Sequence, residues 1–170
     1  YRAYFAFAKN PRINSKGVDT SAVFGFVNTL NELIRKENPT HIGVVFDTNK
    51  PTERHIEYPE YKAHREAMPE GIRDAIKYID KLLIAFNIPK IFKDGYEADD
   101  VIGTLAKKAS QKNMRVIVST GDKDLAQIVD KNISLVNTMT GQLLDENGVV
   151  EKFGIEPGLV IDYLALLGDK

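Results

Sequence analysis

"IPKIFKDGYEADDVIGTLAKKASQKNMRVIVST" spans residues 88–120 and decides the fold class. Residues 88–95 have the composition of a strand, and residues 97–112 open with acids and continue at helical spacing. RVIVST at 115–120 is a β-branched apolar run, which is typical of a buried strand. A strand, a helix and a second strand in succession favour a parallel sheet with right-handed crossovers. The sequence therefore predicts an α/β protein.

The flanking sequence continues this alternation. We expect a helix at 19–37 behind a cap at Thr20 or Ser21, and another at 70–86, because apolar residues recur there at helical spacing. The remaining expected elements are strands at 41–46 and 133–139, helices at 121–130 and 157–168, and a short helix or turn at 148–154. Residues 48–70 interrupt the pattern with three prolines and many polar side chains. We predict one domain over residues 1–170, with segment 48–70 inserted in it.

Composition limits the kinds of site that the chain can carry. The protein has 170 residues, a formal net charge of −1 and no cysteine. Any contact with nucleic acid must therefore come from a local basic patch, and any metal ion must be held by oxygen or histidine ligands, which favours Mg²⁺ or Mn²⁺. With no run of about 18 apolar residues and no leader pattern, the sequence predicts a cytoplasmic protein without a membrane partner.

Acidic residues follow three of the predicted strands at their carboxyl ends. Singly they have ordinary explanations: Asp47 as a turn cap, Asp99 and Asp100 as helix caps, and the Asp122/Asp124 pair as a surface loop. The carboxyl ends of parallel strands share one edge, however, so these acids should converge there together with Glu97. Six acids at one edge exceed what capping needs and favour a site for two hard cations about 3.5–4 Å apart.

Segment 48–70 carries a second signal. Arg54, Tyr61, Lys62, His64 and Arg65 place cations and an aromatic ring within one polar stretch, which suits phosphate contacts and base stacking on a single strand. The alternative is a solvated, proline-punctuated loop. The segment leaves the sheet directly after the first acid, and connections of this length usually have a function.

Four strings carry a family resemblance: GYEADDVIGTLA (95–106), VSTGDKDLAQIV (118–129), YKAHR (61–65) with MPEGIR behind it, and DYLALLGDK (162–170). They closely resemble the 5′ nuclease domains at the amino end of bacterial DNA polymerase I, members of the flap endonuclease family. The resemblance implies a PIN-like α/β fold with helices on both faces and a helical arch, Mg²⁺ or Mn²⁺ at the acidic edge, and cleavage of DNA near a free 5′ end in primer removal and repair.

The resemblance also implies roles for individual residues. The acidic metal positions of the family are matched by Asp47, Glu97, Asp99, Asp100, Asp122, Asp124 and Asp169, of which Asp47, Glu97, Asp99 and Asp122 count as catalytic. In the arch, Lys62 and Arg65 match cations that contact the scissile phosphate, and Tyr61 matches a ring that stacks on a base. Arg2 and Arg54 match basic positions that meet phosphates.

The family pattern extends beyond both ends of the chain. It includes an aspartate in a strand before residue 1, a second aspartate past Asp169, and a helix-turn-helix that grips duplex DNA through K⁺. We therefore expect a monomeric fragment of a bacterial protein, inactive alone and fused to a downstream polymerase region. Two alternatives remain, namely a Toprim-like metal domain and a catalytically incomplete DNA-binding module.

Overall fold

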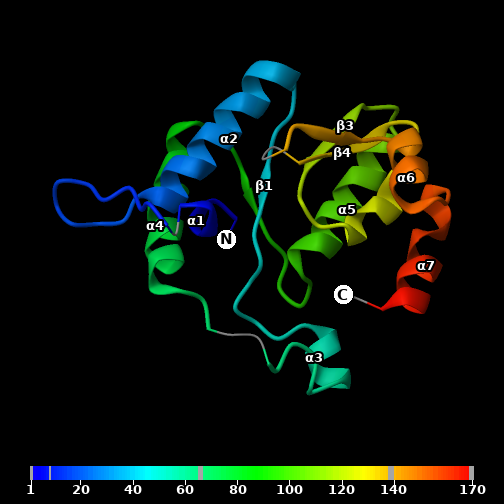
Figure 1. Cartoon of the computed structure of the whole chain (residues 1–170), viewed down its shortest axis with the longest axis horizontal. Coiled ribbons are helices and arrows are strands. Elements are labelled where there is room, and N and C mark those ends of the chain that lie inside the picture. The colour runs from blue at the N-terminus through cyan, green and yellow to red at the C-terminus, as the bar shows by residue number, and fades with distance from the viewer. Residues whose placement is uncertain (1, 8, 65–66, 138–139, 169–170) are drawn as a thin grey trace. The chain divides into compact units, whose positions relative to one another are not determined.

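The computed structural model describes residues 2–7, 9–64, 67–137 and 140–168. Its contacts divide the chain into two compact units, Tyr1–Gly95 and Tyr96–Lys170, and each has its own apolar core. None of the helices in these described ranges is long and apolar enough to span a membrane. Figure 1 labels the α-helices of both units and three of the described strands, β1, β3 and β4.

Within its described residues, the first unit combines four helices with one pair of short strands. Its elements are α1 (Arg2–Ala6), α2 (Ser21–Glu37), β1 (Val44–Val45), α3 (Glu53–Glu57), α4 (Glu70–Ala85) and β2 (Lys90–Ile91). Strands β1 and β2 pair in parallel, with Val44 opposite Lys90. Helix α2 packs against both α1 and α4, and their apolar faces enclose the core residues Ala22, Leu30, Ala75, Ile79, Leu83 and Ile88.

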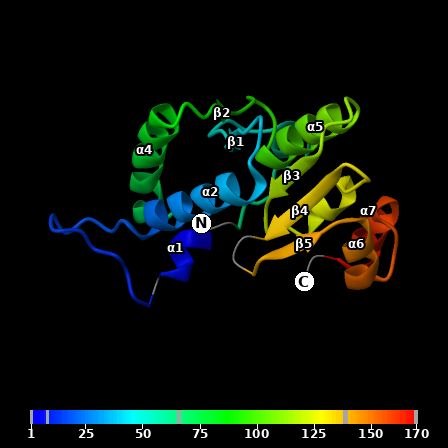
Figure 2. The same ribbon diagram turned by 90° about the horizontal axis from the view of Figure 1, so that it is seen from above.

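The part of the second unit that the structure describes is built on a three-stranded sheet. Its elements are α5 (Ala98–Ser110), β3 (Val116–Ser119), the 3₁₀ helix η1 (Asp124–Ile128), β4 (Ile133–Asn137), β5 (Gln142–Leu144), α6 (Glu146–Phe153), the 3₁₀ turn η2 (Pro157–Leu159) and α7 (Val160–Leu167). Strand β4 lies between β3, which is parallel to it, and β5, which is antiparallel (Figure 2). Ile133, Val149 and Val160 are fully buried in the core.

The predicted alternation of helices and strands is confirmed, with several corrections. Helix α1 and strand β5 were not expected, and β5 adds an antiparallel edge to a sheet expected to be parallel. Strands β1 and β2 have two residues each, fewer than the runs at 41–46 and 88–95 suggested. The helix expected at 121–130 is a five-residue 3₁₀ helix.

The predicted cap of α2 is wrong in its chemistry. Thr20 occupies the N-cap position but makes no side-chain cap bond. Its hydroxyl donates to the Arg12 carbonyl at 2.8 Å, and the Ser21 hydroxyl accepts from the Arg12 N–H at 2.8 Å. The carboxylate of Asp19 accepts from the Ser21 N–H instead. These side chains therefore fasten the preceding loop to the start of the helix.

Candidate functional site

Asp47 comes two residues after β1, in the first unit, and is exposed. Beside it the hydroxyl oxygen of Thr48 is buried, with no hydrogen-bond partner among the residues that the structure describes. Since buried polar atoms are nearly always paired, an orphaned hydroxyl next to a carboxylate suits a site that receives a polar group from outside the chain. Sequence reasoning gave no signal for Thr48, because a threonine after a strand is common.

An ion pair connects the chain that follows β1 to the chain that follows β2. Lys50 lies three residues after Asp47, and its ammonium contacts the carboxylate of Asp94 at 2.7 Å. Both side chains are more than half exposed, so the pair contributes roughly 0–1 kcal/mol. The ion pair matters mainly for position, because it holds the start of segment 48–70 beside the loop that leads to Gly95.

Segment 48–70 is helical only in part within its described residues. Helix α3 has five residues and begins with a reciprocal cap between Thr52 and His55, whose Oγ1 and Nδ1 atoms lie 2.8 Å apart. Thr52 is only 5% exposed, and its burial anchors this end of the segment in the first unit. His55 was not among the residues that the sequence proposed for the site, because it has no partner in the sequence at the spacing of metal ligands.

The arch residues that the sequence singled out come directly after α3. The ring of Tyr61 packs edge-on against His55, with centroids 5.3 Å apart, and the Lys62 ammonium lies 5.0 Å from the Tyr61 centroid. Lys62 has a left-handed backbone, with φ of 58°, so its direction is set by a tight turn rather than by a helix. Arg65 and Asp169 lie outside the described residues, as does the side chain of Arg2.

The acidic helix α5 opens with the capping arrangement that the sequence offered as the ordinary explanation. Glu97 is the N-cap residue, and its side chain accepts from the backbone of Asp100. The carboxylate of Asp100 in turn accepts from the Glu97 N–H at 3.0 Å. Glu97 and Asp100 are half-buried, whereas Asp99 is exposed on the first turn. Two of the three acids therefore stabilise the helix start, and their carboxylates are fixed in direction by it.

The second acidic loop follows β3. The N–H of Asp122 donates to the Thr120 hydroxyl at 3.0 Å, and Oδ1 of Asp122 accepts from the Asp124 N–H at 3.0 Å. The carboxylate of Asp122 thus turns the chain from the strand into η1, and both aspartates are exposed. Their exposure leaves them accessible to a ligand.

The predicted convergence of these acids stays a prediction. Asp47 belongs to the first unit and the other five to the second. Across the described ranges, no three aspartate, glutamate or histidine side chains are grouped so that they could hold a metal ion. The donor set itself fits a hard divalent cation, because it offers carboxylate oxygens, with the orphaned Thr48 hydroxyl beside one of them.

The chain matches the model of a protein family described as "5′-3′ exonuclease, N-terminal resolvase-like domain" over residues 1–154. It is 46% identical to DNA polymerase I of Pseudomonas aeruginosa over 170 residues, covering 100% of this chain and 18% of that protein. It is 42% identical to a 5′-3′ exonuclease of Aquifex aeolicus over the same length, covering 100% of this chain and 58% of that protein.

Solved structures share the fold. A T5 D15 protein co-crystallised with metal ions matches with a TM-score of 0.69 at 19% identity, over 86% of this chain and 59% of that one. The catalytic core of Rad2 in complex with a DNA substrate matches with a TM-score of 0.58 at 23% identity, over 97% of this chain and 50% of that one. These likenesses show the PIN-like α/β fold that the sequence predicted. Together with the family model and the two curated relatives, they establish that the chain belongs to the 5′-3′ exonuclease N-terminal domain family.

Proposed function

We propose that the protein is a metal-dependent nuclease that cuts DNA close to a free 5′ end, as a 5′-3′ exonuclease and 5′ flap endonuclease, within a DNA polymerase I. The observation that carries the proposal is the family match over residues 1–154, which includes all six strand-end acids and the whole of segment 48–70. The match favours this function over the Toprim-like alternative.

The acids would hold the metal. Asp47, Glu97, Asp99, Asp100, Asp122 and Asp124 supply only oxygen ligands, which suits Mg²⁺ or Mn²⁺. When bound, such a pair of ions supplies an activated water and offsets the charge that develops at phosphorus. The T5 D15 neighbour that was co-crystallised with metal ions supports this choice of cofactor class.

The arch residues would orient the substrate. Lys62 and Arg65 would contact the scissile phosphate, where preorganised cations stabilise the added negative charge of the transition state. Tyr61, whose ring is held against His55, would stack on a base near the cut, and Arg54 and Arg2 would meet neighbouring phosphates. Asp169, by its match to a family metal position, would complete the ligand set.

Cleavage of a fluorescent 5′-flap substrate tests the proposal. Full-length protein should cut it in Mg²⁺ and not in EDTA. Asp122→Asn should lower the rate by about 10²-fold or more, since it removes one carboxylate charge from a site that must balance two cations. A matched control is Glu151→Gln, which removes one charge from an exposed position in α6.

Two outcomes would contradict the proposal. Equal cleavage rates for Asp122→Asn and Glu151→Gln would show that the strand-end acids take no part in the reaction. An absence of Mg²⁺-dependent cleavage in the unaltered protein would leave the binding-module alternative.

A further inference from the structure

Beyond its first residue, the exposed Glu70, helix α4 has an exposed face on which every charged side chain is a cation. Its opposite face carries the buried residues Ile72, Ala75, Ile79 and Leu83. Between positions 71 and 85 the exposed residues are Arg73, Lys77, Tyr78, Lys81, Ile84 and Ala85. The three cations follow one another at four-residue intervals, so they form a row about 12 Å long on one side of the helix.

The half-buried acids of α4 neutralise only one cation of this row. Asp74 and Asp80 are half-buried, and each is already engaged with a lysine: Asp74 with Lys77 at 2.8 Å, and Asp80 with Lys90 at 2.8 Å. The hydrogen bond that Lys77 donates to the Asp74 carboxylate raises the pKa of Lys77, so this lysine stays protonated. Within the described part of the chain, neither Arg73 nor Lys81 has an ion-pair partner. The row therefore keeps two uncompensated positive charges.

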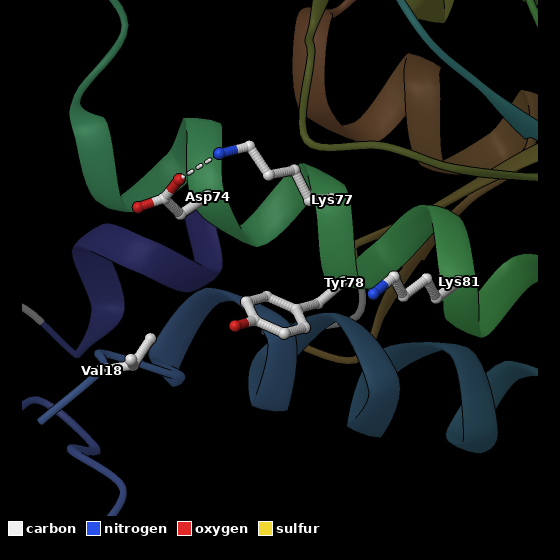
Figure 3. Close-up of a pocket in the computed structure, with 5 residues that line it drawn as sticks. All are labelled: Val18, Asp74, Lys77, Tyr78 and Lys81. Atoms are coloured by element: carbon white, nitrogen blue, oxygen red, sulfur yellow. Dashed lines mark hydrogen bonds and ion pairs between the residues drawn. The ribbon is translucent and has the colours of Figure 1, made fainter. Parts of the chain in front are cut away.

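A hollow lies beside the row. It has a volume of about 250 Å³ and is lined by Val18, from the loop before α2, and by Asp74, Lys77, Tyr78 and Lys81 of α4 (Figure 3). Two ammonium groups and a phenol hydroxyl, which is a hydrogen-bond donor, border the same space. This is the donor chemistry that a phosphate oxygen requires.

We propose that the basic face of α4, formed by Arg73, Lys77, Tyr78 and Lys81, binds the phosphodiester backbone of the DNA on which the protein acts. The inference rests on the proposed function for its ligand, and it adds a contact surface outside segment 48–70. A protein with a net charge of −1 has no general attraction for DNA, so binding must come from local rows of this kind. A backbone contact of this type positions the substrate without reading its sequence.

The alternative is an ordinary solvated helix face. Such faces usually mix both signs of charge at four-residue spacing, as α2 does where Lys36 pairs with Glu32 at 2.7 Å. Exposed residues 73–85 of α4 include no acid, although like charges four residues apart destabilise an isolated helix. The negatively charged phosphates of a DNA strand bound along this face would offset that repulsion. This is the physical reason for preferring a DNA-binding surface to a solvated face.

The test is the salt dependence of DNA binding. Binding of a fluorescent 5′-flap in EDTA is measured between 50 and 200 mM salt for full-length protein and for the double variant Arg73→Ala/Lys81→Ala. The logarithm of the binding constant falls by ~0.9 per phosphate contact for each unit of log salt, so two lost contacts should reduce the slope by about 1.8. At 0.1 M salt this corresponds to a loss of up to about 60-fold in affinity.

Matched variants separate local contacts from total charge. Lys108→Ala/Lys112→Ala removes the same charge from two exposed positions near the end of α5, and should leave the slope close to that of the unaltered protein. Arg73→Lys/Lys81→Arg keeps both charges and should retain the slope. Circular dichroism checks that each variant is folded, and Lys81→Glu alone gives a second test, in which the slope should also fall.

The outcomes distinguish this proposal from the proposed function. In one outcome the unaltered protein binds and cuts the flap, but Arg73→Ala/Lys81→Ala has the same salt-dependence slope as the Lys108→Ala/Lys112→Ala control. The α4 surface is then a solvated face, and only this inference fails. If the unaltered protein neither binds nor cuts the flap, the proposed function fails.

Discussion

Asp130 lies in the loop between η1 and β4 and holds it to the end of α5. Its carboxylate accepts hydrogen bonds from the Asn132 N–H at 2.9 Å, the Ile133 N–H at 3.0 Å, the Ser110 hydroxyl at 3.1 Å and the Lys107 ammonium at 3.1 Å. We predict that Asp130→Ala destabilises the protein far more than Lys107→Ala. Comparing the two variants shows whether the stability comes mainly from the hydrogen bonds that Asp130 accepts from backbone N–H groups or from its ion pair with Lys107.

The size of each effect follows from the contacts. In Asp130→Ala the Ile133 N–H keeps a second acceptor, the carbonyl of residue 130 at 3.0 Å. The Asn132 N–H and the Ser110 hydroxyl lose theirs, and Ser110 is only 9% exposed. Unsatisfied buried groups cost ~1–3 kcal/mol each, so we expect a loss of about 2 kcal/mol in the free energy of unfolding. The Lys107 pair is partly exposed, and its removal should cost roughly 0–1 kcal/mol.

Urea denaturation at pH 7, followed by circular dichroism, gives both free energies. Hydrogen exchange at the amide of Ile133, the first residue of β4, locates the loss. If Lys107→Ala costs as much as Asp130→Ala, the ion pair and not the capped backbone is responsible. If Asp130→Ala costs less than about 0.5 kcal/mol, water replaces the carboxylate and the argument from burial is refuted.

The Asp130 carboxylate also makes the stability of the protein depend on pH, in a direction that follows from its pKa. Burial acts to raise the pKa of Asp130, but hydrogen bonds from the Asn132 backbone, Lys107 and Ser110 outweigh it, so this pKa lies below its ordinary value of 3.8. A carboxyl group with a lowered folded-state pKa stabilises the protein above its unfolded pKa, and that contribution is lost as pH falls through the folded value. The stability difference between the unaltered protein and Asp130→Asn should therefore narrow below about pH 4. A difference that widens there would contradict the assignment.

Two further predictions concern the arch and a helix contact. In the proposed function, Lys62 contacts the scissile phosphate and is not a metal ligand. Lys62→Ala should therefore slow flap cleavage by about 10²–10³-fold and leave Mg²⁺ binding, measured by calorimetry, unchanged. A cleavage rate equal to that of the unaltered protein would mean that segment 48–70 is a solvated loop. Gly71→Ala should lower the melting temperature, since a Cβ atom there would lie 2.7 Å from the Tyr4 ring, at a cost of ~1–3 kcal/mol. Gly103→Ala in α5 is its control and should raise the melting temperature, because its nearest neighbour is at an ordinary 3.7 Å and alanine gains up to ~1 kcal/mol in a helix.

The longer helices and strand β3 could be predicted because the sequence patterns that indicate them lie within each element. The helices expected at 19–37, 70–86 and 97–112 are found at Ser21–Glu37, Glu70–Ala85 and Ala98–Ser110, since apolar residues at helical spacing mark one buried face over three or more turns. Strand β3 was equally clear from its β-branched run. A periodic pattern of this length outweighs any single residue.

The elements that were missed depend on distant contacts. Strand β5 has three residues, two of them exposed, and it exists because it pairs with β4 and buries Leu144 against the core of the second unit. Helix α1 has five residues, too few for a periodic signal, and is held by its packing against α2. Neither contact can be derived from the local sequence.

For the candidate site, the sequence identified the acids but offered capping and metal binding as alternatives. The structure indicates that these explanations are compatible. A carboxylate has two oxygens and about four lone-pair positions, so a cap bond uses only part of its capacity as an acceptor. The cap bonds at Asp100 and Asp122 orient these side chains when the protein folds, before any ligand arrives. Because a ligand that is already ordered loses less conformational entropy on binding, a capped acid is a better metal ligand than a mobile one. Acids at the start of a helix therefore suit metal binding for the same reason that they stabilise the helix.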